Sequence, residues 1–427
     1  MRKIRAREIE GQIVRIGGRG DGVINGPDGS YYVPYTVPGD HVTARIGPPR
    51  GDGFSASLMT LAAPGPDRVD PPCPHFHACG GCALQMLADG AYAEWKRLQV
   101  VAALARQNLA GVTVEPLARV ATQSRRRADL VMRRLQAATL LGFHERGGNR
   151  IIDIATCLVL RPEIVALLPP LRQVFGPMLA VGASADFKVT LTKGGIDIGV
   201  SADVALDADA RAALAQFAES FDLARLSMID PRNGYLDVIV RRRAAVIDFS
   251  GVPVELPPGG FIQASADAEA LMVIRALGAI QHARAVCDLY AGLGAFTFAA
   301  AAAGHKVHAV EGAEDAVSAL QAAARLAPAG ASVTSEVRDL VRAPLMAAEL
   351  NRFDAVIFDP PRAGAPAQAR EIAYSKIAVA VGVSCHPGSF ARDARILADG
   401  GFALASVLPI DQFLWSPHVE LIGVFRR

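Results

Sequence analysis

The sequence contains few cysteines and no long hydrophobic run, and these two shortages exclude whole classes of protein. Six cysteines in 427 residues are too few for a small secreted domain held together by disulfides. No apolar run approaches the roughly 18 residues that a membrane span needs. The N-terminal Met1-Arg-Lys-Ile-Arg also lacks the apolar core of a signal peptide. We therefore expect a cytoplasmic protein with no membrane partner.

Net charge is scarce as well. A formal charge of only +2 excludes a strong basic field over the whole surface, so nucleic-acid binding must come from local patches. The chain is long, however, and 51% of its residues are hydrophobic, which is ample for several globular cores. We expect three domains, covering residues 1–62, 63–255 and 256–427, in a monomer.

A glycine-bearing turn in the last third of the chain is the strongest local pattern. The apolar run 285–290 predicts a buried parallel strand, and an alanine-rich helix begins at Phe296. Gly292 and Gly294 lie between them and allow a turn tight enough for a ligand to approach the backbone. This strand, glycine loop and helix predict the nucleotide-binding start of a doubly wound α/β sheet.

The residues that follow narrow the choice of nucleotide. A second strand, predicted at 306–310, ends in Glu311, whose carboxylate can accept hydrogen bonds from ribose hydroxyls. The third glycine of the dinucleotide fingerprint is missing, because Thr297 stands at that position. This disfavours NAD and favours a methyl-donor nucleotide, S-adenosylmethionine.

Strands and helices continue to alternate up to the C-terminus. The further predicted strands cover 332–337, 355–358, 378–384, 402–408 and 419–425. Ligands of such sheets bind outside the carboxyl ends of the strands. Five residues able to bind or react fall at or just past strand ends, namely Asp288, Glu311, Asp339, Asp359 and Cys385. This coincidence predicts one site along that edge.

Four cysteines before this domain predict a metal centre. Cys73, Cys79 and Cys82 fall within ten residues, with two glycines that let the backbone fold tightly, and Cys157 follows a strand-like run. Four thiolates suit an iron–sulfur cluster or tetrahedral zinc. The spacing alone does not separate these two alternatives.

Two other regions favour RNA as a partner. Residues 1–62 show short alternating runs broken by glycine, which predict a small five-stranded barrel of OB type that resembles the RNA-binding TRAM module. Arg2, Lys3, Arg5 and Arg7 crowd one end of it. The alternative is a barrel that only caps the core.

The region from about 120 to 255 is predicted to be β-rich, with a hairpin at 190–199. Its arginine triplet, Arg125-Arg126-Arg127, could neutralise phosphates. A helix predicted at 91–109 precedes it, and we expect this helix to pack on the catalytic domain.

Cys385 gives the predicted site its chemistry. It follows a buried strand and precedes Pro387, so its thiol is presented at the rim of the sheet. A thiolate there can add to C6 of a uracil ring, because C6 is conjugated to the C4 carbonyl. Addition makes C5 a nucleophile that can take a methyl group from S-adenosylmethionine. A base must then remove the C5 proton, and Glu420 offers a carboxylate.

Together these residues resemble the uracil-C5 RNA methyltransferase family, in its branch with a TRAM module and an iron–sulfur cluster. The resemblance spans nearly the whole chain, and the combination is specific although no single motif is. It is carried by Cys73/Cys79/Cys82/Cys157, Arg125-Arg126-Arg127, Phe261-x-Gln263, Asp288-Leu-Tyr-Ala-Gly-Leu-Gly294, Asp359-Pro-Pro-Arg-Ala-Gly364, Ser384-Cys385-x-Pro387 and His418-Val419-Glu420.

The resemblance implies a fold, a reaction and a set of site residues. The fold would be a Rossmann-like class I methyltransferase domain behind a β-rich central domain and an N-terminal OB-like TRAM barrel. Cys385 would be the nucleophile, Glu420 the base, and the four cysteines the ligands of a 4Fe-4S cluster. The cofactor and uracil pocket would be lined by Gln263, Tyr290, Gly292, Gly294, Glu311, Asp339 and Asp359.

Three positions depart from the family pattern. His386, Ala295 and Ser265 stand where the family usually has asparagine. None of the three removes a reacting group, so the predicted reaction class is unchanged. The departures bear instead on how the cofactor and the target base are held.

Several functions remain open at this point. The resemblance favours 5-methyluridine formation in 23S rRNA, with transfer RNA as the alternative substrate. A non-catalytic RNA-binding or RNA-folding protein is a second class, disfavoured because Cys385 and Glu420 are both present. A redox enzyme that uses the cluster for electron transfer is a third, disfavoured because no flavin motif accompanies the cysteines.

Overall fold

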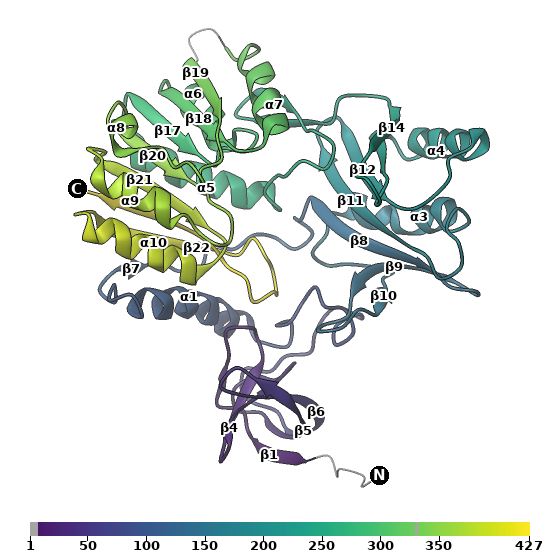
Figure 1. The fold of residues 1–427 in the computed structure, drawn as a ribbon. Helices are drawn as coiled ribbons and strands as arrows, with labels where there is room; N and C mark the ends of the chain where they lie inside the picture. Colours follow the sequence, from purple (N-terminus) through teal and green to yellow (C-terminus); the bar gives the residue numbers. More distant parts are fainter. Residues whose placement is uncertain (1–6, 329–331) are drawn as a thin grey trace. The chain divides into compact units, whose positions relative to one another are not determined.

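The protein is described from a computed structural model, which covers residues 7–328 and 332–427 (Figure 1). The chain divides into two compact units. Unit 1 comprises Met1–Gln99, His144–Arg150 and Phe413–His418, and unit 2 comprises Val100–Phe143, Ile151–Gln412 and Val419–Arg427. Of the basic residues expected to favour RNA, Arg2, Lys3 and Arg5 lie outside the described residues.

Unit 1 contains a six-stranded sheet in the order β1-β5-β6-β4-β3-β2. Its strands are β1 Glu8–Gln12, β2 Arg15–Ile16, β3 Gly22–Gly26, β4 Gly29–Val33, β5 His41–Arg50 and β6 Gly53–Ala63. We predicted five strands. The sixth appears because the chain bends between β1 and β2, where the Ile13 N–H donates to the Asp40 carbonyl and the Val14 N–H to the Val23 carbonyl.

Helix α1, Asp89–Ala105, begins in unit 1, two residues before its predicted start. Within that unit it is anchored by polar contacts along its first part. The Trp95 indole donates to the Ile16 carbonyl over 3.3 Å, and the buried Lys96 ammonium donates to the Phe413 carbonyl over 2.9 Å. The Tyr92 hydroxyl accepts from the Trp415 N–H. Packing of this helix on the catalytic domain stays a prediction.

Unit 2 contains a seven-stranded sheet in the order β10-β9-β8-β11-β12-β13-β14. Its strands are β8 Arg127–Arg134, β9 Thr139–His144, β10 Ile151–Asp153, β11 Ser184–Thr192, β12 Gly195–Ser201, β13 Leu223–Ile229 and β14 Leu236–Arg241. Strands β11 and β12 form the predicted hairpin. One face of the sheet carries an apolar core that helices α2 Pro162–Ala166, α3 Leu168–Phe175 and α4 Ala208–Ser220 help to build. A short hairpin, β15 Val246–Phe249 and β16 Val252–Glu255, follows.

The second sheet of unit 2 has eight strands in the order β19-β18-β17-β20-β21-β23-β22-β7. Its strands are β7 Thr113–Val114, β17 Ala285–Leu289, β18 Lys306–Glu311, β19 Ser332–Val337, β20 Ala355–Phe358, β21 Val379–Ser384, β22 Ala403–Ile410 and β23 Glu420–Arg426. The strands predicted from the sequence agree with these bounds to within two residues. Strand β23 is antiparallel to both of its neighbours, β21 and β22.

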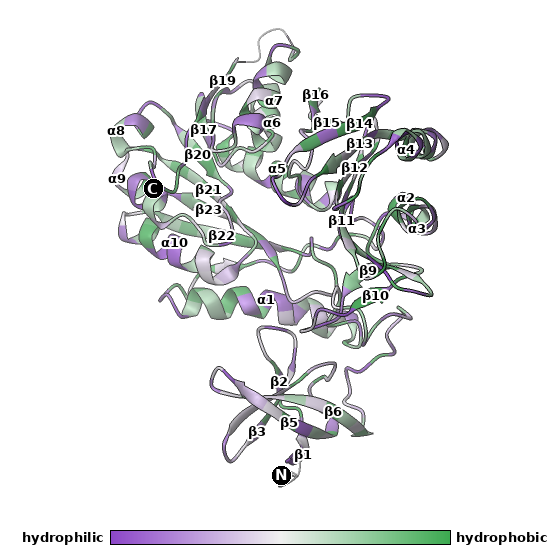
Figure 2. Ribbon diagram, turned by 45° about the vertical axis from the view of Figure 1, so that its right-hand side comes forward, coloured by the Kyte–Doolittle hydropathy of each residue, from purple (hydrophilic) through white to green (hydrophobic). Residues whose placement is uncertain are grey.

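Helices cover both faces of this sheet. Their bounds are α5 Ala266–Ile280, α6 Ala295–Ala302, α7 Glu314–Ala324, α8 Ala347–Leu350, α9 Pro366–Tyr374 and α10 Pro387–Asp399. Helices α5 and α6 share one core with the strands. On the other face, the Phe390 ring of α10 packs against Phe425 of β23. Strands β21 and β23 are hydrophobic because both faces are covered (Figure 2).

None of the helices within the described ranges combines the length and the apolar character that a bilayer crossing requires.

Candidate active site

The turn after β17 has the geometry that a bound nucleotide needs. Gly294 caps α6 with φ +96°, and a Cβ there would come within 2.8 Å of the Phe298 ring, so only glycine fits. Tyr290, just past β17, also adopts a left-handed backbone with φ +61°. Backbone N–H groups of such a loop, placed before a helix N-terminus, favour an approaching nucleotide.

Asp288 links the strand before this turn to the helix after it through a hydrogen bond. It lies within β17, 1% exposed, and its Oδ2 accepts from the Thr297 hydroxyl over 2.6 Å. Its Oδ1 has no hydrogen-bond partner among the described residues. Burial raises the pKa of Asp288 to about 7.

Glu311 and Asp339 follow the next two strands along the sheet. The Glu311 carboxylate accepts three backbone N–H groups, from Gly292, Gly312 and Ala313. A carboxylate offers about four acceptor positions, so capacity for a ribose hydroxyl remains. Asp339 is exposed and accepts the N–H groups of Val341 and Arg342, as a turn-stabilising aspartate does. Burial raises the pKa of Tyr290, and the nearby charges of Asp393, Asp339 and Glu311 raise it further.

Asp359, Cys385 and Glu420 meet at the same edge of the sheet. Asp359 immediately follows β20 and Cys385 immediately follows β21, which pairs in parallel with β20. Glu420 opens β23, whose Leu421 pairs with Ser384, so Glu420 falls opposite Cys385. The antiparallel direction of β23 is what brings the first residue of one strand to the end of another.

Each of these three groups has a raised pKa. Burial raises the pKa of the half-buried Cys385 to about 11, with Glu420 and Asp359 adding to the shift and Arg362 opposing it. Burial followed by repulsion from Asp359 raises the pKa of Glu420, and burial raises that of Asp359. Such clusters of perturbed groups are typical of active sites.

Two glutamine amides connect the carboxylates. The Gln263 amide N–H donates to Asp359 Oδ2 over 2.9 Å, and the Gln412 amide N–H donates to Glu420 Oε2 over 2.9 Å. The same Gln412 nitrogen donates to Gln263 Oε1, also over 2.9 Å. The sequence indicated Gln263 but not Gln412, because one glutamine in a loop carries no recognisable pattern.

The turn that holds Cys385 is fixed by local hydrogen bonds. The His386 N–H donates to the Ser384 hydroxyl, and His386 Nδ1 accepts the Ser389 N–H as the N-cap of α10. Burial and nearby Arg362 and Arg392 lower the pKa of His386, which favours the neutral ring. Of the other two departures, Ser265 caps α5 and Ala295 opens α6.

The arginine triplet does not act as one group. Arg126 is committed to the fold: its guanidinium pairs with Glu269 over 2.7 Å and donates to the Gln263 carbonyl. Arg125 donates to the Arg127 carbonyl. Arg127 instead stacks on Phe261, with the guanidinium carbon 4.3 Å from the ring centroid, and its Nε has no hydrogen-bond partner in the described part of the chain.

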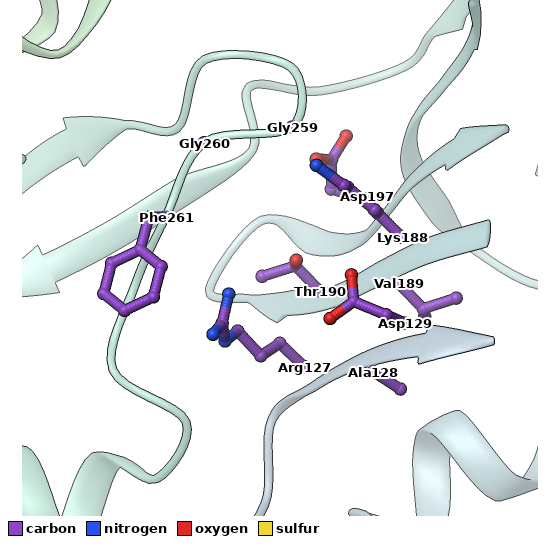
Figure 3. A pocket seen from close by; sticks show the side chains of 10 residues that line it. All are labelled: Arg127, Ala128, Asp129, Lys188, Val189, Thr190, Asp197, Gly259, Gly260 and Phe261. Carbon is purple, nitrogen blue, oxygen red and sulfur yellow. The ribbon is translucent and has the colours of Figure 1, made fainter. Parts of the chain in front are cut away.

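The stacked pair of Arg127 and Phe261 lines a pocket of about 190 Å³ (Figure 3). Lys188 and Thr190 reach into it from β11, and the loop Gly259–Phe261 forms the opposite wall. Phe261 is 62% exposed, which is unusual for a ring of its size. An exposed ring beside a cation suits the stacking of a nucleobase.

The predicted cysteine ligands are divided between the two units. Cys73, Cys79 and Cys82 lie on one loop of unit 1, and Cys157 lies in unit 2. The loop is held by the Gly80 N–H, which donates to the His144 carbonyl, and the Gly81 N–H donates to Cys79 Sγ over 3.5 Å. Within the described residues, no three His, Cys, Asp or Glu side chains are grouped as ligands of one metal ion.

Comparisons with known proteins bear on this site. Residues 253–427 match the family model described as tRNA (Uracil-5-)-methyltransferase. An uncharacterized RNA methyltransferase of Brucella suis is 44% identical over 96% of each chain. The 23S rRNA (uracil(1939)-C(5))-methyltransferase RlmD of Chromohalobacter salexigens is 32% identical over 97% of this chain and 88% of its own.

The chain belongs to the RNA uracil-C5 methyltransferase family. Its methyltransferase fold is shown by the tRNA (uracil-54, C5)-methyltransferase of Pyrococcus abyssi, solved with S-adenosyl-L-homocysteine. That structure is 22% identical, covers 98% of this chain and 100% of its own, and has a TM-score of 0.76. Family membership confirms the enzyme class that the motifs indicated.

Proposed function

We propose that this family member methylates C5 of uridine in RNA through a covalent bond between Cys385 and uracil C6, with Glu420 as the base. The observation that carries the proposal is the convergence of Cys385, Glu420 and Asp359 at the edge of the sheet, with the glycine loop after β17 on the same edge. S-adenosylmethionine, when bound at that loop, supplies the methyl group.

The proposed reaction has two stages, attack on C6 by Cys385 and later removal of the C5 proton by Glu420. The thiol of Cys385 first loses its proton to solvent base, and its sulfur then bonds to C6 while the C5–C6 double bond becomes an enolate. C5 takes the methyl group as the bond from methyl to the cofactor sulfur breaks. Glu420 removes the C5 proton, the C5–C6 double bond reforms, and the sulfur leaves C6.

We propose that the RNA is held in part by the polar face of the seven-stranded sheet. Arg127 and Lys188 would neutralise phosphates and Phe261 would stack on a base, with the target uridine extruded from its surroundings to expose C6. Residues 1–62 would act as a TRAM-like RNA-binding barrel, where Arg50 lies over the Tyr32 ring at 4.7 Å. The relative named as a 23S rRNA methyltransferase is 32% identical to this chain, against 22% for the structure named as a tRNA methyltransferase, which favours rRNA over tRNA.

We also propose that Cys73, Cys79, Cys82 and Cys157 hold a 4Fe-4S cluster with a structural role. The support is the chemistry of the donors: three thiols on one tightly folded loop, and a backbone N–H directed at Cys79 Sγ, as is usual around cluster sulfurs. Anaerobically purified protein should contain iron and sulfide in equal amounts. Zinc without iron would contradict this assignment.

The replacement Glu420→Gln tests the main proposal. The carboxamide has nearly the shape of the carboxylate but cannot take the C5 proton, so a methylated protein–RNA adduct should accumulate and survive denaturing electrophoresis. Cys385→Ala should form no adduct. Wild-type protein should form a comparable adduct only on RNA carrying 5-fluorouridine at the target. Turnover of Glu420→Gln near the wild-type rate would remove Glu420 from the mechanism.

Mass spectrometry of digested RNA decides the substrate. RNA from a strain lacking the gene should have lost one 5-methyluridine, in 23S rRNA if the preference for rRNA is right. Loss from tRNA alone would overturn that preference and leave the chemistry intact.

A further inference from the structure

Gln412 occupies a position in the catalytic edge that its place in the sequence does not reveal. It lies two residues past the end of β22, and Glu420 opens β23, which pairs with β22 through Ile410 and Glu420. The side chains of Gln412 and Glu420 are both 3% exposed. A buried primary amide is costly unless its hydrogen-bonding groups find partners, so the partners of Gln412 bear on why it is there.

Every hydrogen-bonding group of the Gln412 amide except one acceptor position has a partner. Its nitrogen carries two hydrogens, and it donates to Glu420 Oε2 and to Gln263 Oε1, both over 2.9 Å. Its Oε1 accepts the N–H of Ser265 over 3.4 Å. Because a backbone N–H can only donate, this contact places the oxygen of Gln412 toward Ser265 and its nitrogen toward Glu420.

The orientation of Gln412 in turn fixes that of Gln263. Gln263 Oε1 is occupied by the Gln412 N–H, so its own nitrogen is left facing Asp359, to which it donates over 2.9 Å. A single chain of hydrogen bonds therefore runs from Glu420 through two amides to Asp359. Reversing either amide would point a carbonyl oxygen at a carboxylate.

No cation within the described part of the chain forms an ion pair with Glu420. The titratable and charged groups that face it are Asp359 after β20 and Cys385 after β21, with Arg362 acting on Cys385. Asp359 repels its charge, and burial penalises the same charge. The Gln412 N–H is the contact that favours the ionised form, and it lowers the pKa of Glu420 against those two effects.

We propose that Gln412 is a positioning residue, which favours the ionised form of Glu420 that takes the C5 proton and turns Gln263 so that its N–H faces Asp359. The inference rests on the proposed function, in which Glu420 is the base. It predicts that loss of Gln412 leaves attack by Cys385 and methyl transfer in place. The step that it slows is the later removal of the C5 proton.

The test is the pH dependence of adduct decay in the full-length protein, followed in single turnovers on substrate RNA. Gln412→Met keeps the length of the side chain and removes both donors. We expect the midpoint of elimination to move up by at least about one pH unit, which makes elimination about tenfold slower at pH values below both midpoints. RNA affinity should change less than about twofold, because Gln412 is itself buried and presents almost no surface to the RNA.

Gln368 provides a matched control. It is fully buried in α9, and its amide donates to the Leu345 carbonyl and accepts the Leu345 N–H, with no hydrogen bond to the Glu420–Asp359 chain. Gln368→Met should lower thermal stability as Gln412→Met does, with no change in the pH midpoint. Should Gln412→Met not fold, Gln412→Glu keeps the shape, loses the donors and should move the midpoint in the same direction.

The outcomes separate this inference from the proposed function. An unshifted midpoint in Gln412→Met, beside a trapped adduct in Glu420→Gln, would overturn the role of Gln412 alone. Normal turnover of Glu420→Gln would overturn both. A shifted midpoint beside a trapped adduct supports both.

Discussion

Two buried carboxylates in unit 2 differ in the group that donates hydrogen bonds to them. Asp197, on the seven-stranded sheet, is 4% exposed and accepts from Arg225 through both of its oxygens, over 2.7 and 3.0 Å. Glu420, on the eight-stranded sheet, is 3% exposed and accepts a hydrogen bond from the neutral amide of Gln412. A cation balances a buried charge permanently, whereas an amide leaves the carboxylate able to exchange a proton.

On the proposed function, this difference separates a structural ion pair, Asp197 with Arg225, from a reactive group, Glu420. A carboxylate locked to a guanidinium is a poor base, because protonation would strand the buried cation. A carboxylate among amides, a thiol and a second acid keeps a raised pKa, which makes it a stronger base than an ordinary carboxylate. The same distinction appears within the arginine triplet, where Arg126 is paired with Glu269 and Arg127 faces a pocket.

The largest expected effect is a loss of turnover when Cys385, the proposed nucleophile beside Glu420, is replaced. Cys385→Ala should lower turnover by about 10⁴-fold or more, because no other group at this edge can form the bond to C6. Folding should be unaffected, since Cys385 is only half-buried. Methyl transfer from labelled S-adenosylmethionine to RNA measures the loss. Residual activity within tenfold of wild type would mean that the reaction needs no covalent bond to Cys385.

Breaking the ion pair between Asp197 and Arg225 should instead lower the free energy of unfolding. Arg225→Met leaves Asp197 buried without its cation, and breaking a buried ion pair in this way costs about 3–5 kcal/mol. Denaturant unfolding should show this loss, while methyl transfer per folded molecule stays near wild type. Asp197→Leu in the same chain should restore part of the stability, because the orphaned charge is then removed. A catalytic defect larger than the loss of folded protein would erase the distinction.

The sequence reveals the reactive group more readily than its partners. Strand ends can be located from apolar runs, and this placed Asp359 and Cys385 correctly beside one another because consecutive parallel strands end at one edge. The position of Glu420 depends on β23 entering between β21 and β22, which periodicity does not indicate. Gln412 and the separation of Arg126 from Arg127 depend on side-chain contacts between residues more than 100 positions apart.

The separation within the triplet predicts two different phenotypes. Arg127→Ala should weaken RNA binding by about tenfold and reduce the salt slope by about one, because one phosphate contact is lost. Arg126→Ala should mainly lower stability, since its ion pair with Glu269 is largely buried. Titration of RNA affinity against salt, beside thermal unfolding, distinguishes them. Equal salt slopes in wild type and Arg127→Ala would assign Arg127 to structure as well.

A third buried carboxylate, Asp288, extends the comparison of Asp197 with Glu420. Here the expected effect, on the pH dependence of stability, is the smallest. Its Oδ2 accepts from the Thr297 hydroxyl, and, as for Glu420, no cation among the described residues forms an ion pair with it. Burial raises its pKa to about 7. Between the unfolded pKa near 4 and the folded pKa, the native state binds more protons than the unfolded state. Its contribution to stability is therefore complete below about pH 4 and declines as the pH rises through about 7.

Asp288→Asn removes that dependence, because the amide keeps the acceptor for Thr297 and never ionises. Relative to wild type, the variant should become steadily more stable as the pH rises from 5 to 8. Asp354 provides a matched control, because the pKa of its carboxyl is lowered where that of Asp288 is raised. It accepts hydrogen bonds from the N–H groups of Ala285 and Arg284, which lower its pKa. Asp354→Asn should therefore be less stable than wild type at pH 8, and the difference in stability should shrink as the pH falls toward 4. Thermal unfolding across this pH range measures both. A parallel response of the two variants would mean that burial without a cation does not set the behaviour of Asp288, and the contrast between Asp197 and Glu420 would then need another cause.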